Sequence, residues 1–219
     1  METLRIANLI TSAHEFCIHE KDKQRKELFS ITDGKAVGTF VEHLFQDFLS
    51  KKYNITIGSS ASGLDLPSIN TDIKVTSIRQ PQSSSPYKDS KQKIYGLGYN
   101  LIIFVYEKHN DNRHRTSCLN FVSCVFISAE RTGDYQMTTG LQQIIQNNGN
   151  AEDIFAFLCA HRIPADEITL MQMAKEILHS PPPIGYLTIS NALQWRLQYG
   201  RVVNLKEQVD GITTIVQYE

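Results

Sequence analysis

Cysteine is scarce in this chain of 219 residues, and its distribution excludes one class of site. The four cysteines form no CxxC pair, and three of them lie in apolar runs. Their spacing argues against a structural zinc site and is typical of buried thiols in a reducing compartment. The residues are Cys17, Cys118, Cys124 and Cys159.

Long hydrophobic runs and an excess of charge of one sign are also missing. The longest apolar run, Leu101 to Tyr106, is far too short to span a bilayer, and the N-terminus has no signal-peptide pattern. The formal net charge of -1 gives no general attraction to nucleic acid or to a membrane. We therefore expect a soluble intracellular protein without a membrane partner, on which any DNA-binding surface is a local patch.

Several catalytic signatures are absent as well. The seven histidines are scattered and form no HExxH motif. His109 and His114 fall within one short polar turn, which does not suit a His-Asn-His nuclease. No Gly-rich phosphate loop and no serine or cysteine nucleophile signature occurs. These absences exclude the commonest hydrolase and nucleotide-binding motifs.

The most informative stretch that is present runs from Gly63 to Ser77. A β-strand over 71–77 places Asp72 and Lys74 on one face, because successive side chains of a strand alternate. The turn-rich residues 67–70 predict that the chain folds back and brings Asp65 to the same polar face. Two carboxylates and an amine then converge in the outline of a metal site. The alternative is a surface ion pair between Asp72 and Lys74, worth roughly 0 to 1 kcal/mol.

A helix before this stretch carries a third acid. Thr32 and Asp33 are good N-caps for a helix reaching about Tyr53, whose apolar side chains form a dense stripe. Glu42 lies on the edge of that stripe, where an acid needs either solvent or a positive partner. It is either a solvated glutamate or a carboxylate that reaches the metal of Asp65 and Asp72.

Two polar segments offer candidate contacts to DNA. Residues 78–87 contain two prolines and are expected to be irregular, and they directly follow the strand with Asp72 and Lys74. Arginine and glutamine can make bidentate hydrogen bonds to base edges. An ordinary solvated loop is the alternative. The candidate residues are Arg79, Gln80 and Gln82 here, with Arg113 and Arg115 in the polar turn 109–115.

The order of elements predicts an α/β (α+β) fold, with a mixed central sheet flanked by helices. Two buried strands, 99–107 and 119–128, are joined by the polar turn and suggest an antiparallel pair. We expect a core at 1–150 with N-terminal helices, and a mainly helical region at 151–219. Predicted helices in this region, the last at 190–199, are followed by strands at 201–205 and 212–218, which suggest a terminal β-hairpin. Helices followed by a hairpin resemble a winged helix-turn-helix, which would serve for DNA recognition or for support of the core.

Asp65, Asp72 and Lys74, with Glu42 on a preceding helix, resemble the PD-(D/E)xK nuclease superfamily, and most of all a type II restriction endonuclease. Residues 35–128 match the order of elements in that family. The chain departs from the family at the first acid, where Leu64-Asp65 stands in place of Pro-Asp.

The resemblance implies Mg2+-dependent hydrolysis of double-stranded DNA that leaves 5'-phosphates. Asp65, Asp72 and the main-chain carbonyl of Ile73 would bind the metal, and hard oxygen ligands favour Mg2+ over zinc. Lys74 would orient or deprotonate the attacking water, and Glu42 would hold a metal-bound water or a second ion. It also implies a homodimer on a palindromic site, a companion DNA methyltransferase, and the cytoplasm of a bacterium or archaeon.

Two other functions remain open on the sequence. A DNA repair or junction-resolving nuclease would use the same acids on DNA selected by its structure. A non-catalytic DNA-binding regulator would use the C-terminal region, with Asp72 and Lys74 as a plain ion pair. An interaction domain without nucleic acid is a third, simpler possibility.

Overall fold

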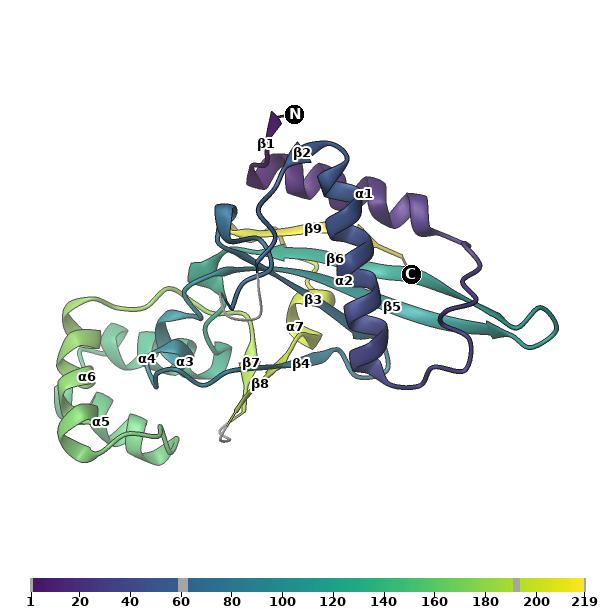
Figure 1. The fold of residues 1–219 in the computed structure, drawn as a ribbon. Helices are drawn as coiled ribbons and strands as arrows, with labels where there is room; N and C mark the ends of the chain where they lie inside the picture. Colours follow the sequence, from purple (N-terminus) through teal and green to yellow (C-terminus); the bar gives the residue numbers. More distant parts are fainter. Residues whose placement is uncertain (1, 59–62, 191–193, 219) are drawn as a thin grey trace. The chain divides into compact units, whose positions relative to one another are not determined.

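The structure, a computed structural model, describes residues 2–58, 63–190 and 194–218. The chain forms two compact units that alternate along the sequence (Figure 1). The first unit comprises 1–83, 100–127 and 203–219, and the second comprises 84–99 and 128–202. None of the helices in the described ranges has the length and apolar character that crossing a bilayer requires.

The first unit is built on a four-stranded mixed sheet in the order β3-β5-β6-β9. β3 pairs in parallel with β5, whereas β5 with β6 and β6 with β9 are antiparallel. The elements are β1 (Glu2–Thr3), α1 (Ile6–Glu20), α2 (Gly34–Ser50), β2 (Tyr53–Asn54), the 3-10 helix Pro67–Ile69, β3 (Thr71–Ser77), β5 (Asn100–Asp111), β6 (Thr116–Ile127) and β9 (Ile212–Gln217). This arrangement confirms the mixed sheet flanked by helices and leaves β3 at an edge.

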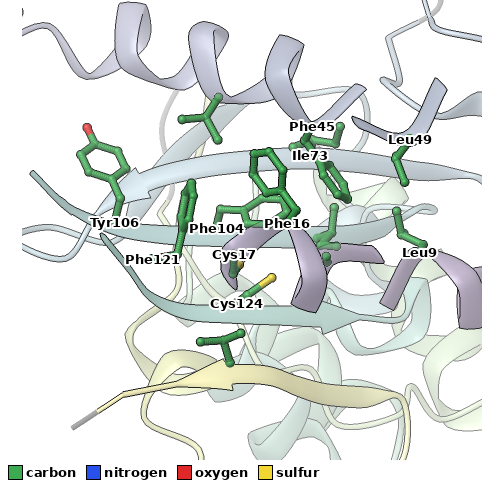
Figure 2. Packing of buried hydrophobic residues seen from close by; sticks show 14 of the residues in the cluster. Leu9, Phe16, Cys17, Phe45, Leu49, Ile73, Phe104, Tyr106, Phe121 and Cys124 are labelled. Carbon is green, nitrogen blue, oxygen red and sulfur yellow. The ribbon is translucent and has the colours of Figure 1, made fainter. Parts of the chain in front are cut away.

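The core of the first unit lies between α1, α2 and one face of this sheet. Figure 2 shows aromatic side chains of both helices packed against β5 and β6. The rings of Phe16, Phe45 and Phe104 meet with centroids 4.9–5.6 Å apart, and Phe121 adds a fourth ring 5.6 Å from Phe16. Tilted and edge-to-face contacts at such distances add to the gain from apolar burial. This core fixes α2 against the sheet.

The second unit contains the helices of the middle of the chain and a three-stranded sheet in the order β4-β8-β7. Asp134 caps α4 by accepting from the N–H of Met137, and its other oxygen accepts from Ile189. Its elements are α3 (Gln92–Tyr95), the 3-10 helix Ala129–Arg131, α4 (Tyr135–Gln146), α5 (Ala151–Ala160), α6 (Glu167–His179), β7 (Thr188–Ile189) and β8 (Trp195–Gln198). β4 (Gln82–Ser85) and α7 (Gly200–Val203) lie where the chain passes between the units.

The C-terminal prediction is wrong in detail. The expected helix 190–199 contains strand β8, because Trp195 and Leu197 are buried while the residues between and after them are exposed. Its residues 191–193 lie outside the described ranges. Residues of the expected strand 201–205 form part of α7, and β9 pairs with β6 instead of forming a terminal hairpin. A long-range partner thus replaced the local one.

Three other expectations concern residues 128–150, the segment 78–87 and the cap of α2. Residues 128–150, expected in the core, belong to the second unit, while β9 belongs to the first, because β9 completes the sheet next to β6. The segment 78–87, expected to be irregular, contains the short strand β4. The predicted cap of α2 is confirmed, since the Asp33 carboxylate accepts from the N–H groups of Lys35 and Ala36.

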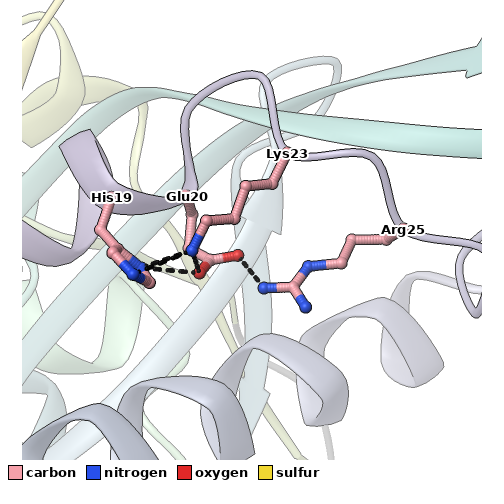
Figure 3. Close-up of polar contacts among 4 residues, drawn as sticks. All are labelled: His19, Glu20, Lys23 and Arg25. Atoms are coloured by element: carbon pink, nitrogen blue, oxygen red, sulfur yellow. Dashed lines mark hydrogen bonds and ion pairs between the residues drawn. The ribbon is translucent and has the colours of Figure 1, made fainter.

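A buried acid ties the end of α1 to the following loop (Figure 3). Glu20, 8 % exposed, accepts from Lys23 Nζ at 3.0 Å and from the Arg25 guanidinium, and His19 Nδ1 lies 3.0 Å from it. Arg25 in turn exchanges two main-chain hydrogen bonds with Ser117 of β6. Burial opposes ionisation of Glu20, but hydrogen bonds from Arg25 and Lys23 outweigh it and lower the pKa of that carboxyl.

Replacing this acid tests the contribution of the cluster. We expect Glu20→Gln to lower the free energy of unfolding by about 2 kcal/mol near neutral pH, because two partly buried cations lose their counter-charge. The folded pKa lies below the unfolded one, so the stabilisation is present above about pH 4.3 and is lost as the pH falls through the folded value. Urea denaturation at several pH values should therefore show the two proteins converging in acid. The control Glu15→Gln affects an exposed pair with Lys52 and should cost under about 0.5 kcal/mol; equal losses would contradict the assignment.

Candidate active site

The polar face of β3 carries the acid and the amine that the sequence predicts. Asp72 and Lys74 point to the same side of the strand, and Lys74 Nζ lies 2.6 Å from Asp72 Oδ2. Their side chains are 8 % and 19 % exposed, so this pair is not a solvated surface ion pair. Because β3 is an edge strand, one side of it is open to groups from other parts of the first unit.

Asp65 lies at that open edge. Its Oδ2 accepts from the N–H of Ile73 at 2.7 Å, a donor that the pairing with β5 leaves unused. Two main-chain hydrogen bonds between Leu66 and Thr71 close the chain back on itself, and Asn70 adopts a left-handed conformation (φ +48°) to allow it. The predicted return of the chain is confirmed, and it forms through a single antiparallel bridge and a 3-10 turn.

The turn is held by Asn100, a residue distant from it in the sequence. Asn100, the first residue of β5, donates from Nδ2 to the carbonyl of Ile69 at 3.2 Å and to Thr71 Oγ1 at 3.3 Å. Thr71 Oγ1 itself donates to the carbonyl of Ile69 at 2.9 Å. Asn100 is thirty residues away from this turn in the sequence, so no local pattern could have indicated it.

Glu42 reaches the same edge from α2. One turn earlier in that helix, Gly38 lies against Val75 of β3, which sets the position of Glu42 above the strand. Glu42 is half-buried and is within hydrogen-bonding reach of Asp65. The structure therefore brings all four predicted side chains together: Glu42, Asp65, Asp72 and Lys74.

The electrostatics of this cluster are dominated by crowded, buried carboxyls. The pKa of Asp72 is raised to about 7, because burial and a hydrogen bond with Asp65 together outweigh the opposing effect of the Lys74 ammonium group. Burial also raises the pKa of Glu42, which the hydrogen bond with Asp65 and the charge of Lys74 only partly offset. A close ion pair alone would depress the pKa of Asp72, so the raised value shows that burial and the hydrogen bond with Asp65 outweigh the ion pair with Lys74.

Oxygen atoms form the donor set at this edge. The N–H and C=O groups of one strand residue point to the same side, so the carbonyl of Ile73 faces the open edge as its N–H does. Carboxylate and carbonyl oxygens suit a hard divalent cation better than zinc. In 2–58, 63–190 and 194–218, no three His, Cys, Asp or Glu side chains are already grouped closely enough to form a complete metal site. The donors fit a cation in chemical type, and Lys74 occupies part of the space beside Asp72.

The candidate DNA contacts fall into two groups. Arg79 and Gln80 are exposed just after β3, and Gln82 is half-buried at the start of β4. Arg113 and Arg115 lie at the far end of the β5/β6 hairpin, about eight residues or roughly 26 Å along β5 from the position that pairs with Lys74. The structure places the first group next to β3 and the second well away from it.

Comparison with known proteins identifies the family of the chain. Residues 3–214 match the model of a family described as type II restriction enzyme NspV. A type II restriction enzyme NspV from Nostoc sp. is 50% identical over 215 residues, which cover 98% of each chain. No solved structure matches. The chain therefore belongs to the NspV family of type II restriction enzymes and is a site-specific endonuclease.

Proposed function

We propose that this endonuclease hydrolyses phosphodiester bonds of double-stranded DNA with Mg2+, at the edge of β3, and leaves 5'-phosphates. The observation that carries the proposal is a connected set of side chains, in which Asp72 contacts Lys74 and Asp65, and Asp65 contacts Glu42, with the pKa of Asp72 raised to about 7. Family membership supports the reaction, and type II restriction enzymes generally use a divalent metal.

The metal would be held by oxygen atoms of this edge. Asp65, Asp72 and the main-chain carbonyl of Ile73 would be direct ligands, and Glu42 would hold a coordinated water or a second ion. Mg2+ bound there would supply Lewis-acid stabilisation of the charge on the phosphate. Its two positive charges would also favour the ionised form of Asp72, which burial and the hydrogen bond with Asp65 disfavour.

Lys74 would act on the attacking water. Its ammonium group is held against Asp72 on the polar face, so it is fixed in orientation instead of moving freely in solvent. An amine next to a cation loses its proton more readily, which allows it to orient the water and help to deprotonate it. This role is independent of which bases the enzyme reads.

DNA would be read by the segment that follows β3, residues 78–82, which we call the reading segment. Arg79 and Gln80 are exposed there, and both side-chain types can make bidentate contacts to base edges. Gln82 would contribute from the start of β4. Arg113 and Arg115, at the distant hairpin end, would contact DNA without reading the bases next to the cut. Residues 151–219 would read DNA or support the core.

The remaining partners follow from cutting both strands of a palindromic site. Two-fold symmetry of such a site calls for a homodimer, in which each subunit cuts one strand. A companion DNA methyltransferase would protect the host sequence, and both enzymes would act in the bacterial cytoplasm. Family membership favours this reading over a repair or junction-resolving nuclease, and the buried acid cluster favours it over a non-catalytic regulator.

Removing one acid or the lysine should abolish cleavage. We expect Asp72→Asn, Asp65→Asn and Lys74→Ala each to slow Mg2+-dependent cutting of phage DNA by at least about a thousandfold, because each removes a metal ligand or the group that acts on water. Glu42→Gln, which acts through a coordinated water, should cost about ten- to a hundredfold. Asp47→Asn, at an exposed acid of α2, is the matched control. Discrete fragments from Asp72→Asn at the normal rate would refute the proposed site.

The raised pKa of Asp72 predicts how stability depends on pH in EDTA. The folded pKa is above the unfolded value of about 3.9, so the carboxyl favours folding most at low pH, and this contribution is lost as the pH rises from about 4 to 7. Asp72→Asn should therefore raise the melting temperature relative to wild type more at about pH 8 than at about pH 5. Adding Mg2+ at about pH 8 should stabilise wild type and leave Asp72→Asn little changed. Parallel pH curves in EDTA would contradict the assigned pKa.

Substitutions can distinguish the proposed role of the reading segment from that of the distant arginines. Arg79→Ala should reduce cleavage of the cognate duplex by about 10- to 100-fold and relax discrimination at one base pair, since a bidentate contact is lost. Arg113→Ala should weaken binding to all sequences alike and reduce its salt dependence. Cleavage and filter binding with cognate and singly altered duplexes measure both effects. Unchanged discrimination in Arg79→Ala would remove this residue from base reading.

A further inference from the structure

Thr76 is the third residue on the polar face of β3, two positions after Lys74. It is only 6 % exposed, although its side chain carries a hydroxyl. Thr76 Oγ1 accepts from the N–H of Gln82 at 3.1 Å. It also lies 3.2 Å from the carbonyl oxygen of Gln80 and 3.1 Å from that of Gln82, to which it donates. One hydroxyl thus joins the end of the catalytic strand to the far end of the reading segment.

Further hydrogen bonds hold the reading segment, residues 78–82, in a closed turn. The N–H of Gln80 donates to the carbonyl of Ser77, and the N–H of Arg79 donates to Ser77 Oγ, both at 3.3 Å. The N–H of Ile78 donates to the carbonyl of Tyr106 on β5 at 2.9 Å. Residues 78–80 are exposed at the tip of this closed turn. The direction of the tip therefore depends on the bonds of Thr76, which lies at its base.

We infer that Thr76 is a specificity-determining positioning residue, which fixes the base-reading side chains of residues 79–82 in register with Asp72 and Lys74. The inference rests on the proposed function of this site. Thr76 and Lys74 are about 6.6 Å apart along one rigid strand, with no joint between them. A base pair contacted by Arg79 or Gln80 is thereby held at a defined distance from the scissile phosphate, and misplacement of about 1 Å is enough to slow a reaction strongly.

A purely structural role for Thr76 predicts something different. A hydroxyl that only satisfies a turn would affect stability, and its loss would leave the choice between DNA sequences as it was. A positioning hydroxyl affects the ratio between cognate and altered sequences and leaves the metal requirement unchanged. Discrimination and metal dependence are therefore the readouts that separate the two roles.

The experiment compares Thr76→Val, which keeps the shape and removes the hydroxyl, with Thr76→Ser, which keeps the hydroxyl. Thr213→Val, at an exposed threonine of β9 in the same sheet, is the matched control. Full-length proteins are assayed for kcat/KM on a duplex that carries the mapped wild-type cleavage site and on duplexes with one base pair changed. We expect Thr76→Val to lower cognate kcat/KM about tenfold or more and the discrimination ratio about tenfold. Thr76→Ser should stay within about threefold of wild type, and the Mg2+ concentration for half-maximal rate should be unchanged.

Three results would overturn the inference. Thr76→Val could retain the wild-type discrimination ratio, or Thr76→Ser could lose as much as Thr76→Val. If Thr76→Val and a second hydroxyl-free variant, Thr76→Ala, both fail to fold by circular dichroism, then Thr76 is a stability residue and the inference also falls. Failure of the proposed site looks different, because Asp72→Asn would then still cut DNA or the wild type would cut without Mg2+.

Discussion

The position of β3 at an open sheet edge is the constraint on which the site depends. β3 pairs with β5 on one side only, and this leaves the N–H of Ile73 to be satisfied by the Asp65 carboxylate at 2.7 Å. That single hydrogen bond fixes the first acid relative to the strand that carries Asp72 and Lys74. The aromatic core beneath holds α2 in place, so Glu42 approaches the same edge from a separate element.

The cluster of Glu42, Asp65, Asp72 and Lys74 is electrostatically unfavourable, and this points to a role other than stability. The folded chain retains three half-buried or buried carboxyls around one ammonium group, and the pKa of Asp72 rises to about 7 in spite of an ion pair at 2.6 Å. A protein gains nothing in stability from such crowding. Strained or costly arrangements of this kind are expected at sites that bind a cation or perform chemistry. The local physics therefore supports the proposed site, and family membership shows independently that the chain is a site-specific endonuclease.

Local sequence patterns correctly predicted the features that depend on neighbours in the sequence. They failed for features that depend on pairing between distant strands. Asp33 as a cap, the alternation of β3, and the return of the chain before it all depend on neighbours in sequence, and each was predicted. The prediction of a C-terminal hairpin was wrong because β9 pairs with β6 instead of with a neighbouring strand. The two interleaved units could not be anticipated either, since an element's unit is set by its long-range contacts.

The sequence alone determined the residue types of the site and their placement on one face of a strand, because side-chain alternation needs only a strand. It also determined the superfamily resemblance, through the spacing of Asp72 and Lys74 after Asp65. Tertiary structure decided that β3 is an edge strand, that Asn100 secures the turn before it, and that Thr76 is hydrogen-bonded to the segment after it. The physical reason is that edges, burial and side-chain partners arise only when segments distant in the chain pack together.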